Sequence, residues 1–225
     1  KLVRTCVASL SGSRSFGPMV AAEAQERGFY QAKRRAFVAD GAQYNWAIHR
    51  GYFKDFEPIV DLLHVLCYLY LAAQAVGEDD EGRWRTYAGW LTACWRGEVA
   101  GVIDELDGWR TRLSERLGEP PKKAQMDAND PRRLVGEALS YLRNNQGRMD
   151  YPRYRREGLP ITSSLAESLV GEVNARVKGE QKYWNRPGGA EAILQLRAAV
   201  LSDDERLERH FAQRPGNPYR RRPVA

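Results

Sequence analysis

The stretch RAFVADGAQYNWAIHRGYFKDFEPIVDLLH, residues 35–64, decides the fold class. It contains two short apolar runs, at 36–39 and 58–60, and each run is followed by an aspartate. A segment with helical spacing at 44–50 separates them, and an apolar helix from Leu62 to Val76 comes next. The alternation of strand and helix predicts an α/β domain with at least some parallel strand pairing.

Most of the remaining chain is expected to be helical. Residues 1–9 are the exception, because their alternating and β-branched side chains predict one more strand. Residues 118–131 have the composition of a linker, and residues 147–163, rich in Arg, Tyr, Pro and Gly, are expected to be irregular. Apolar spacing and the placement of Pro and Gly predict helices over residues 16–28, 81–117, 132–144, 163–178 and 190–201.

The composition is that of an ordinary globular chain. Of the 225 residues, 43% are hydrophobic and 28% are charged, which indicates neither wholesale disorder nor a membrane protein. The longest apolar run, Leu62 to Val76, is shorter than the roughly 20 residues that cross a bilayer. No secretory signal opens the chain. Three cysteines at no disulfide-like or zinc-like spacing fit a reducing cytoplasm: Cys6, Cys67 and Cys94.

The net charge of +6 is concentrated at the end of the chain. Residues 141–225 hold 16 Lys and Arg against 10 Asp and Glu, a surplus as large as that of the whole chain. Basic side chains displace counterions from DNA, so this segment favours a DNA-binding surface. A solvated basic surface without a partner is the alternative, and residues 215–225 have the composition of a disordered basic tail.

Three acidic residues lie where chemistry is expected. Asp40 follows an apolar strand, at the edge where open α/β sheets hold their sites, although Asp40-Gly41 is also a common turn. Asp61 ends the second strand and precedes His64 by three positions, a spacing that also suits an Asp that caps a helix. Glu167 follows a Ser-Ser pair in the pattern of a capping box, so its spacing alone is equally compatible with a structural role.

Several blocks, in their order, resemble the catalytic region of DDE-type insertion-sequence transposases from bacteria. The resemblance spans nearly the whole chain, and residues 4–70 and 148–201 are its most distinctive parts. The blocks are the quoted stretch up to Trp46, FEPIVDLLH at 56–64, MDYPRYRREGLPI at 149–161, Ser-Ser-x-x-Glu ending at Glu167, Trp184, and AEAILQLR at 190–197.

The resemblance implies an α/β fold, namely a partial ribonuclease H-like domain with a mostly helical insertion. Residues 1–70 would form the first part of the catalytic core, and residues 71–142 the helical insertion. Residues 143–210 would complete the core and carry the helix with the catalytic Glu. Residues 211–225 would be a basic disordered tail.

The resemblance also implies a metal site. Asp40 matches the second catalytic Asp and Glu167 the catalytic Glu, both ligands of Mg²⁺, with Mn²⁺ as a substitute. Asp61 and His64 match a family motif that is close to the metal site but not usually a ligand. Phosphodiester cleavage develops negative charge, which two divalent ions roughly 4 Å apart stabilise. Hard Mg²⁺ prefers oxygen ligands, so carboxylates suit this chemistry.

The sequence departs from the family pattern in two places. Residues 1–39 contain no Asp, and their acids are Glu23 and Glu26, which fall on the first expected helix. The first catalytic Asp is therefore expected to lie before Lys1 or to have been lost, which would leave this fragment two of three metal ligands and little or no activity. The Ser-Ser pair before Glu167 also replaces a more glycine-rich turn.

A basic segment after Glu167 is expected to follow the DNA backbone, with an aromatic side chain that stacks on an unpaired base. Packing of the tryptophan in the core, with solvated charges around it, is the alternative. The residues of this segment are Arg176, Lys178, Lys182, Trp184 and Arg186.

The resemblance therefore implies a transposase that cleaves DNA and transfers strands with Mg²⁺. Its partners would be transposon ends and target DNA, on which it would form a homo-oligomer, without a membrane. Its place would be the bacterial cytoplasm, at the nucleoid when bound to DNA. An inactive relative kept as a DNA-binding or regulatory protein, or a nuclease of the same fold, is the alternative.

Overall fold

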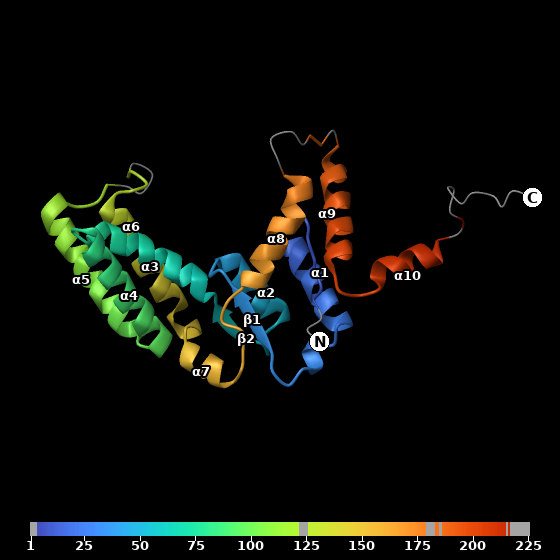
Figure 1. Ribbon diagram of the computed structural model, residues 1–225, viewed down its shortest axis with the longest axis horizontal. Helices are drawn as coiled ribbons and strands as arrows, with labels where there is room; N and C mark the ends of the chain where they lie inside the picture. Colours follow the sequence, from blue (N-terminus) through green and yellow to red (C-terminus); the bar gives the residue numbers. More distant parts are fainter. Residues whose placement is uncertain (1–3, 122–125, 179–182, 185, 215, 217–225) are drawn as a thin grey trace, which may run out of the picture. The chain divides into compact units, whose positions relative to one another are not determined.

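The computed structural model describes residues 4–121, 126–178, 183–184, 186–214 and 216, except for the side chains of Arg176 and Pro187. The chain forms two compact units (Figure 1). The larger unit comprises Ala24–Ser164, and the smaller unit comprises Lys1–Glu23 with Leu165–Ala225. Each unit has its own buried apolar cluster.

The larger unit is mostly helical and contains a small sheet. The order of its elements follows the predicted alternation of strand and helix up to residue 76. Its elements are η1 (Phe29–Gln31), β1 (Ala36–Ala39), α2 (Gln43–Tyr52), β2 (Glu57–Val60), α3 (Leu62–Val76), α4 (Asp80–Arg96), α5 (Val99–Leu117), α6 (Pro131–Asn145), η3 (Gln146–Arg148) and α7 (Tyr151–Arg156).

The sheet consists of β1 and β2, which pair in parallel. Ala36 lies opposite Glu57, and Ala39 lies opposite Val60. Parallel strands need a crossover, and α2 provides it. The predicted strands and their parallel pairing are confirmed, and the mixed α/β class agrees with a mostly helical unit that contains this small sheet.

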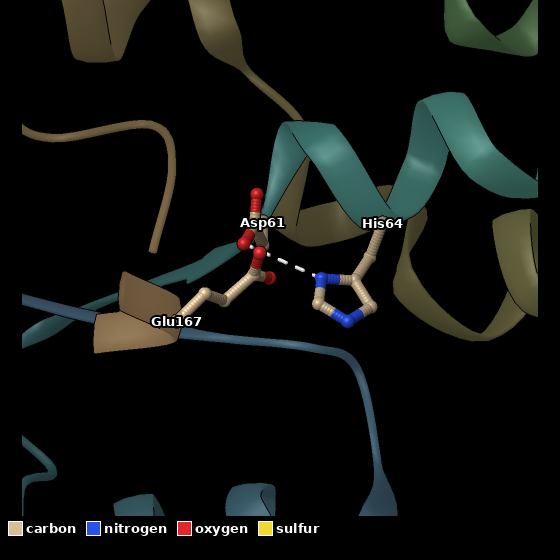
Figure 2. A group of neighbouring side chains, drawn as sticks. All are labelled: Asp61, His64 and Glu167. Atoms are coloured by element: carbon tan, nitrogen blue, oxygen red, sulfur yellow. Dashed lines mark hydrogen bonds and ion pairs between the residues drawn. The ribbon is translucent and has the colours of Figure 1, made fainter. Parts of the chain in front are cut away.

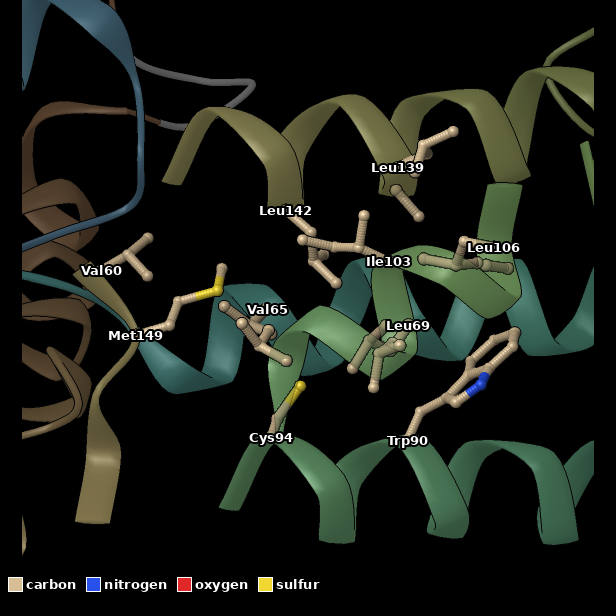
Figure 3. Close-up of a cluster of buried hydrophobic side chains, with 14 of the residues drawn as sticks. Val60, Val65, Leu69, Trp90, Cys94, Ile103, Leu106, Leu139, Leu142 and Met149 are labelled. Atoms are coloured by element: carbon tan, nitrogen blue, oxygen red, sulfur yellow. The ribbon is translucent and has the colours of Figure 1, made fainter. Parts of the chain in front are cut away.

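The core of the larger unit surrounds α3, whose apolar sequence explains its central position. Val65, Leu69, Ala72 and Ala73 on this helix are all completely buried. Around α3 pack α4, α5 and α6, and the strand β2 adds Val60 (Figure 3). Helices α4 to α6 therefore share one core with the sheet, and the segment expected to be an insertion is packed into the same unit as the strands.

Helices α4 and α5 divide the periodic stretch predicted over 81–117. The division falls at Gly97, which has a left-handed φ of 83° and ends α4. The side of α4 that faces the core contains Trp90 and Cys94, which are buried, and Tyr87, which packs against them, whereas Trp84 and Trp95 are exposed.

Residues 147–163 are not wholly irregular, which corrects the prediction. They contain most of η3 and the short helix α7. Asp150 caps α7 by accepting a hydrogen bond from the backbone N–H of Arg153, and a proline lies in its first turn, where a missing N–H is harmless. Tyr151 of this helix is completely buried and donates to the carbonyl of Val60 at 3.1 Å.

The described part of the smaller unit is mostly helical, and its buried apolar cluster joins α8 and α9 through Val173, Val177, Ala190 and Leu194. Helix α8 begins at the last residue of the larger unit, and α1 ends just inside it. Helix α10 was not predicted, and residues 217–225 of the expected tail lie outside the described residues. The helices are α1 (Ser13–Glu26), α8 (Ser164–Val177), α9 (Pro187–Leu201) and α10 (Arg206–Gln213).

The strand predicted over residues 1–9 is wrong for the residues that the structure describes. Residues 4–9 adopt no regular structure. Their backbone bonds to the end of α9, because the N–H of Cys6 donates to Ser202 Oγ at 3.0 Å and the carbonyl of Arg4 accepts from the N–H of Asp203 at 2.7 Å. Alternation of side chains does not reveal whether a neighbouring strand exists, and here a helix end takes its place.

No helix among the described residues is both long and apolar enough to cross a membrane.

The three cysteines should differ strongly in reactivity, because only a thiolate attacks an alkylating reagent. Cys67 is exposed, while Cys94 is completely buried and its burial raises the pKa of the thiol to about 12. Burial also raises the pKa of Cys6. In native protein at pH 8 we expect Cys67 to be alkylated more than about 100-fold faster than Cys94.

Iodoacetamide pulses followed by peptide mass spectrometry measure these rates. A Cys67→Ser variant is the control, since it should lose the fast phase alone. Similar rates at Cys67 and Cys94 in native protein would contradict the packing of α4 against α3.

Candidate metal centre

Asp40 directly follows β1, and Asp61 directly follows the neighbouring strand β2. Ala39 pairs with Val60, and the pairing continues for one more bond, since the N–H of Asp61 donates to the carbonyl of Ala39 at 2.8 Å. Both aspartates therefore lie at the carboxyl ends of neighbouring parallel strands. This is the edge at which open α/β sheets hold their ligands.

The side chain of Asp40 fixes the turn that follows β1. Its Oδ1 accepts hydrogen bonds from the N–H of Ala42 at 2.9 Å and from Asn45 Nδ2 at 2.8 Å. Among the described residues none donates a hydrogen bond to Oδ2. One oxygen of Asp40 thus holds the turn, and the other remains available for a cation.

Gly41 allows this turn to lie against α6. Its φ is 89°, in the left-handed region that favours glycine. A Cβ atom here would lie 2.7 Å from the ring of Tyr141 and 3.0 Å from Asn145 Nδ2. The Asp40-Gly41 dipeptide is therefore required by close packing as well as by backbone conformation.

Hydrogen bonds from side chains of α2 and α6 hold the backbone of this turn. Tyr141 Oη donates to the carbonyl of Asp40 at 2.8 Å, and Trp46 Nε1 donates to the carbonyl of Gly41 at 3.1 Å. The same Trp46 N–H lies 3.0 Å from Asn145 Oδ1. Burial raises the pKa of Tyr141, so its hydroxyl keeps the proton that it donates. Helices α2 and α6 together fix where Asp40 lies.

Asp61 is completely buried and caps α3 (Figure 2). Its Oδ1 accepts from the N–H of Leu63 at 2.7 Å, which confirms the capping interpretation. Its Oδ2 contacts His64 Nδ1 at 3.3 Å and accepts from both the N–H and the hydroxyl of Ser163. The side chain of His64 is partly exposed, so it is not a core histidine.

Ser163 connects Asp61 to the start of α8. The N–H of Leu62 also donates to the carbonyl of Ile161 at 3.0 Å, so this stretch of chain is held beside the end of β2. Helix α8 begins at Ser164, and Glu167 lies in its first turn. The hydroxyl of Ser163 donates to Asp61. The two serines before Glu167, Ser163 and Ser164, therefore have different roles.

Asp61, His64 and Glu167 together offer two carboxylates and an imidazole that could hold a metal ion (Figure 2). These side chains differ in how many lone-pair positions remain for a cation. An ionised carboxylate has about four acceptor positions, and Asp61 already uses three on Oδ2 and one on Oδ1. Asp61 is therefore better suited to positioning its neighbours than to binding a cation, whereas Asp40 keeps an oxygen available.

The residues predicted to contact DNA are described in part. Trp184 is 40% exposed, and its Nε1 donates to the carbonyl of Val177 at 3.0 Å, which satisfies the end of α8. Arg186 is exposed at the start of α9, and Lys178 is exposed after α8. The side chain of Arg176 and the whole of Lys182 lie outside the described residues. Trp184 has a local structural role, and its contact with DNA stays a prediction.

Sequence reasoning missed Tyr141 and Asn145, although positions 141 and 145 are one helical turn apart and share a face. Ser163 belongs to the Ser-Ser pair noted in the sequence, but its contact with Asp61 was missed, since the two positions are 102 apart.

Comparison with protein-family models, curated proteins and solved structures found no match.

Proposed function

We propose that the chain is the later part of the catalytic region of a DNA transposase, which cleaves phosphodiester bonds and transfers strands with a divalent cation. The placement of Asp40 and Asp61 at one edge of a parallel sheet carries the proposal. Asp61 supports it further by binding Ser163, four residues before Glu167. Of the two carboxylates implied by the resemblance, Asp40 lies at this edge. Glu167 comes four residues after Ser163, which Asp61 holds beside the same edge.

In this proposal Asp40 and Glu167 bind the cation. Asp40 contributes through Oδ2, while its Oδ1 holds the turn. When bound, Mg²⁺ would neutralise charge on the phosphoryl group and lower the pKa of the attacking water or 3′-hydroxyl. Gly41, which lacks a side chain, leaves room for close approach of the backbone to its neighbours.

Asp61 acts as a positioning residue. Its buried carboxylate holds Ser163 and contacts His64, so it determines where the chain that carries Glu167 leaves the sheet. His64 would add an imidazole to the site, a ligand that suits Mn²⁺ or Zn²⁺ better than Mg²⁺. Two ligand sets are therefore distinguishable: Asp40 with Glu167 predicts a preference for Mg²⁺ and Mn²⁺, and Asp61, His64 and Glu167 predicts binding of Zn²⁺.

Loss of Asp40 or Glu167 is expected to remove metal binding and cleavage together. Titration calorimetry with Mn²⁺ should show an affinity at least about 10-fold lower for Asp40→Asn and for Glu167→Gln, because each removes a charged ligand. In the full-length protein, where the resemblance implies all three carboxylates, cleavage of a supercoiled plasmid that carries the DNA flanking the gene should fall by about 100-fold or more with Mg²⁺.

Matched controls are Asp55→Asn in the turn before β2 and Glu172→Gln on α8, both exposed. Neither control variant should change the affinity for Mn²⁺ or the rate of DNA cleavage. Zn²⁺ binding that survives Asp40→Asn but not His64→Ala would favour the second ligand set. Metal binding and DNA binding without cleavage by the full-length wild type would favour the inactive, DNA-binding relative.

A further inference from the structure

Two arginines, Arg50 and Arg148, lie near the turn that follows Asp40. Arg148 lies over the ring of Trp46, with its Cζ 4.5 Å from the ring centroid, and donates to the carbonyl of Asn144 at 3.2 Å. Arg50 is exposed in the last turn of α2. Among the described residues neither arginine forms an ion pair with a carboxylate.

Several other arginines of the larger unit form ion pairs. Arg153 pairs with Glu57, Arg132 with Asp130, and Arg143 with Asp107. Two cations that lie close together repel each other, and an anion bound between them relieves the repulsion. Among the described residues no carboxylate does this for Arg50 and Arg148.

Geometry brings these two arginines to the same place. Trp46 and Arg50 are four residues apart on α2, so they share one face of the helix. Arg148 covers the ring of Trp46 from η3. Partial burial lowers the pKa of Arg148, and the nearby charge of Arg50 lowers it further, which agrees with this arrangement.

Trp46 ties this pair of cations to the candidate metal centre. Its Nε1 donates to the carbonyl of Gly41, the residue after Asp40. The guanidinium of Arg148 is therefore separated from the Asp40 turn by one indole ring. Because guanidinium groups match the oxygens of a phosphate, such a pair is suited to bind an anionic phosphate group beside the reacting bond.

We propose that Arg50 and Arg148 bind one backbone phosphate of the DNA strand that enters the Asp40 edge. The inference rests on the proposed function, because that function supplies a phosphodiester substrate. Free phosphate has the same chemistry and is the other source that could satisfy the two guanidinium groups. Contacts with a backbone phosphate would position the strand without reading its sequence.

The double variant Arg50→Gln with Arg148→Gln tests the proposal in the full chain. Binding to a fluorescent DNA duplex is measured by anisotropy in EDTA, over a range of salt concentrations. We expect the slope of log K against log salt to become shallower by about 0.9, the value for one phosphate contact. At low salt the affinity should fall by about 10-fold, equally for duplexes of unrelated sequence.

Two further variants serve as controls. Arg112→Gln removes an arginine that is stacked in the same manner, 4.0 Å over Trp109 on α5, and should leave the slope unchanged. A double Lys variant, Arg50→Lys with Arg148→Lys, keeps both charges and should keep the slope. Thermal unfolding monitored by tryptophan fluorescence verifies that each variant folds.

The outcomes separate this proposal from the proposed function. An unchanged slope in a folded Gln variant, with wild-type binding intact, overturns the phosphate contact alone. An unchanged slope combined with loss of thermal stabilisation by inorganic phosphate assigns the site to free phosphate and also overturns the DNA contact. A shallower slope in a protein that never cleaves DNA supports the contact while the transposase proposal fails. If the wild type does not bind DNA, both fail.

Discussion

Replacement of Asp61 by alanine is expected to lower the free energy of unfolding of the larger unit by about 4 kcal/mol. The carboxylate is completely buried and accepts hydrogen bonds from Leu63 N–H and from the N–H and hydroxyl of Ser163. Removal would leave these donors without an acceptor, at a cost of roughly 1–3 kcal/mol for each buried group. The capping of α3 would be lost at the same time.

Urea unfolding followed by tryptophan fluorescence measures this change, because Trp46 and Trp90 are both buried in the larger unit. Asp55→Ala removes an exposed aspartate and should change stability by less than about 0.5 kcal/mol. Hydrogen exchange should also accelerate at residues 161–163 in the Asp61 variant. A loss below about 1 kcal/mol, with slow exchange retained there, would show that Asp61 does not hold this segment.

Replacement of Gly41 by alanine is expected to destabilise the larger unit by about 3 kcal/mol. A left-handed φ costs a residue with a Cβ roughly 1–2 kcal/mol. The new Cβ would also meet the Tyr141 ring at 2.7 Å and its hydroxyl at 2.9 Å, so the bond from Tyr141 to the carbonyl of Asp40 would have to lengthen or break. Loss of that bond adds about 1 kcal/mol.

Gly51→Ala is the matched control, because Gly51 lies within α2 and a Cβ there meets nothing within 4 Å. It should stabilise the protein by about 0.5–1 kcal/mol through helix propensity. Opposite signs for the two substitutions, measured by the same urea titration, are the expected result. An equal or stabilising effect at Gly41 would mean that the turn does not lie against Tyr141.

Much of the larger unit could be predicted because its signals are local. Strand β1 and helix α3 have the bounds that the apolar runs predict, since an aspartate caps α3 and Gly77 ends it. Helix α7 was missed because Arg, Tyr and Pro are typical of irregular chain, whereas Asp150 and an early proline are in fact a helix start. The strand prediction was wrong for residues 4–9 because alternation of side chains does not show whether a neighbouring strand is present.

The candidate site also has features that the sequence predicted and features that it could not predict. Parallel pairing alone placed Asp40 and Asp61 at one edge. The contact between Asp61 and Ser163 could not be predicted, since it joins positions 102 apart whose sequences carry no shared pattern. The donor capacity of each carboxylate also depends on these distant contacts. For that reason the sequence could nominate Asp40 but could not distinguish an available oxygen from one already occupied.

The hydrogen bond from Tyr141 to the carbonyl of Asp40 also limits how this protein can evolve. Each residue of an α-helix turns the next side chain by about 100°. One residue added inside α6 ahead of Tyr141 would therefore direct the hydroxyl away from Asp40, whereas a length change in the connection before Pro131 would leave the helix register intact. Relatives of this chain should vary in length before α6 and keep its turn count constant from Pro131 to Tyr141.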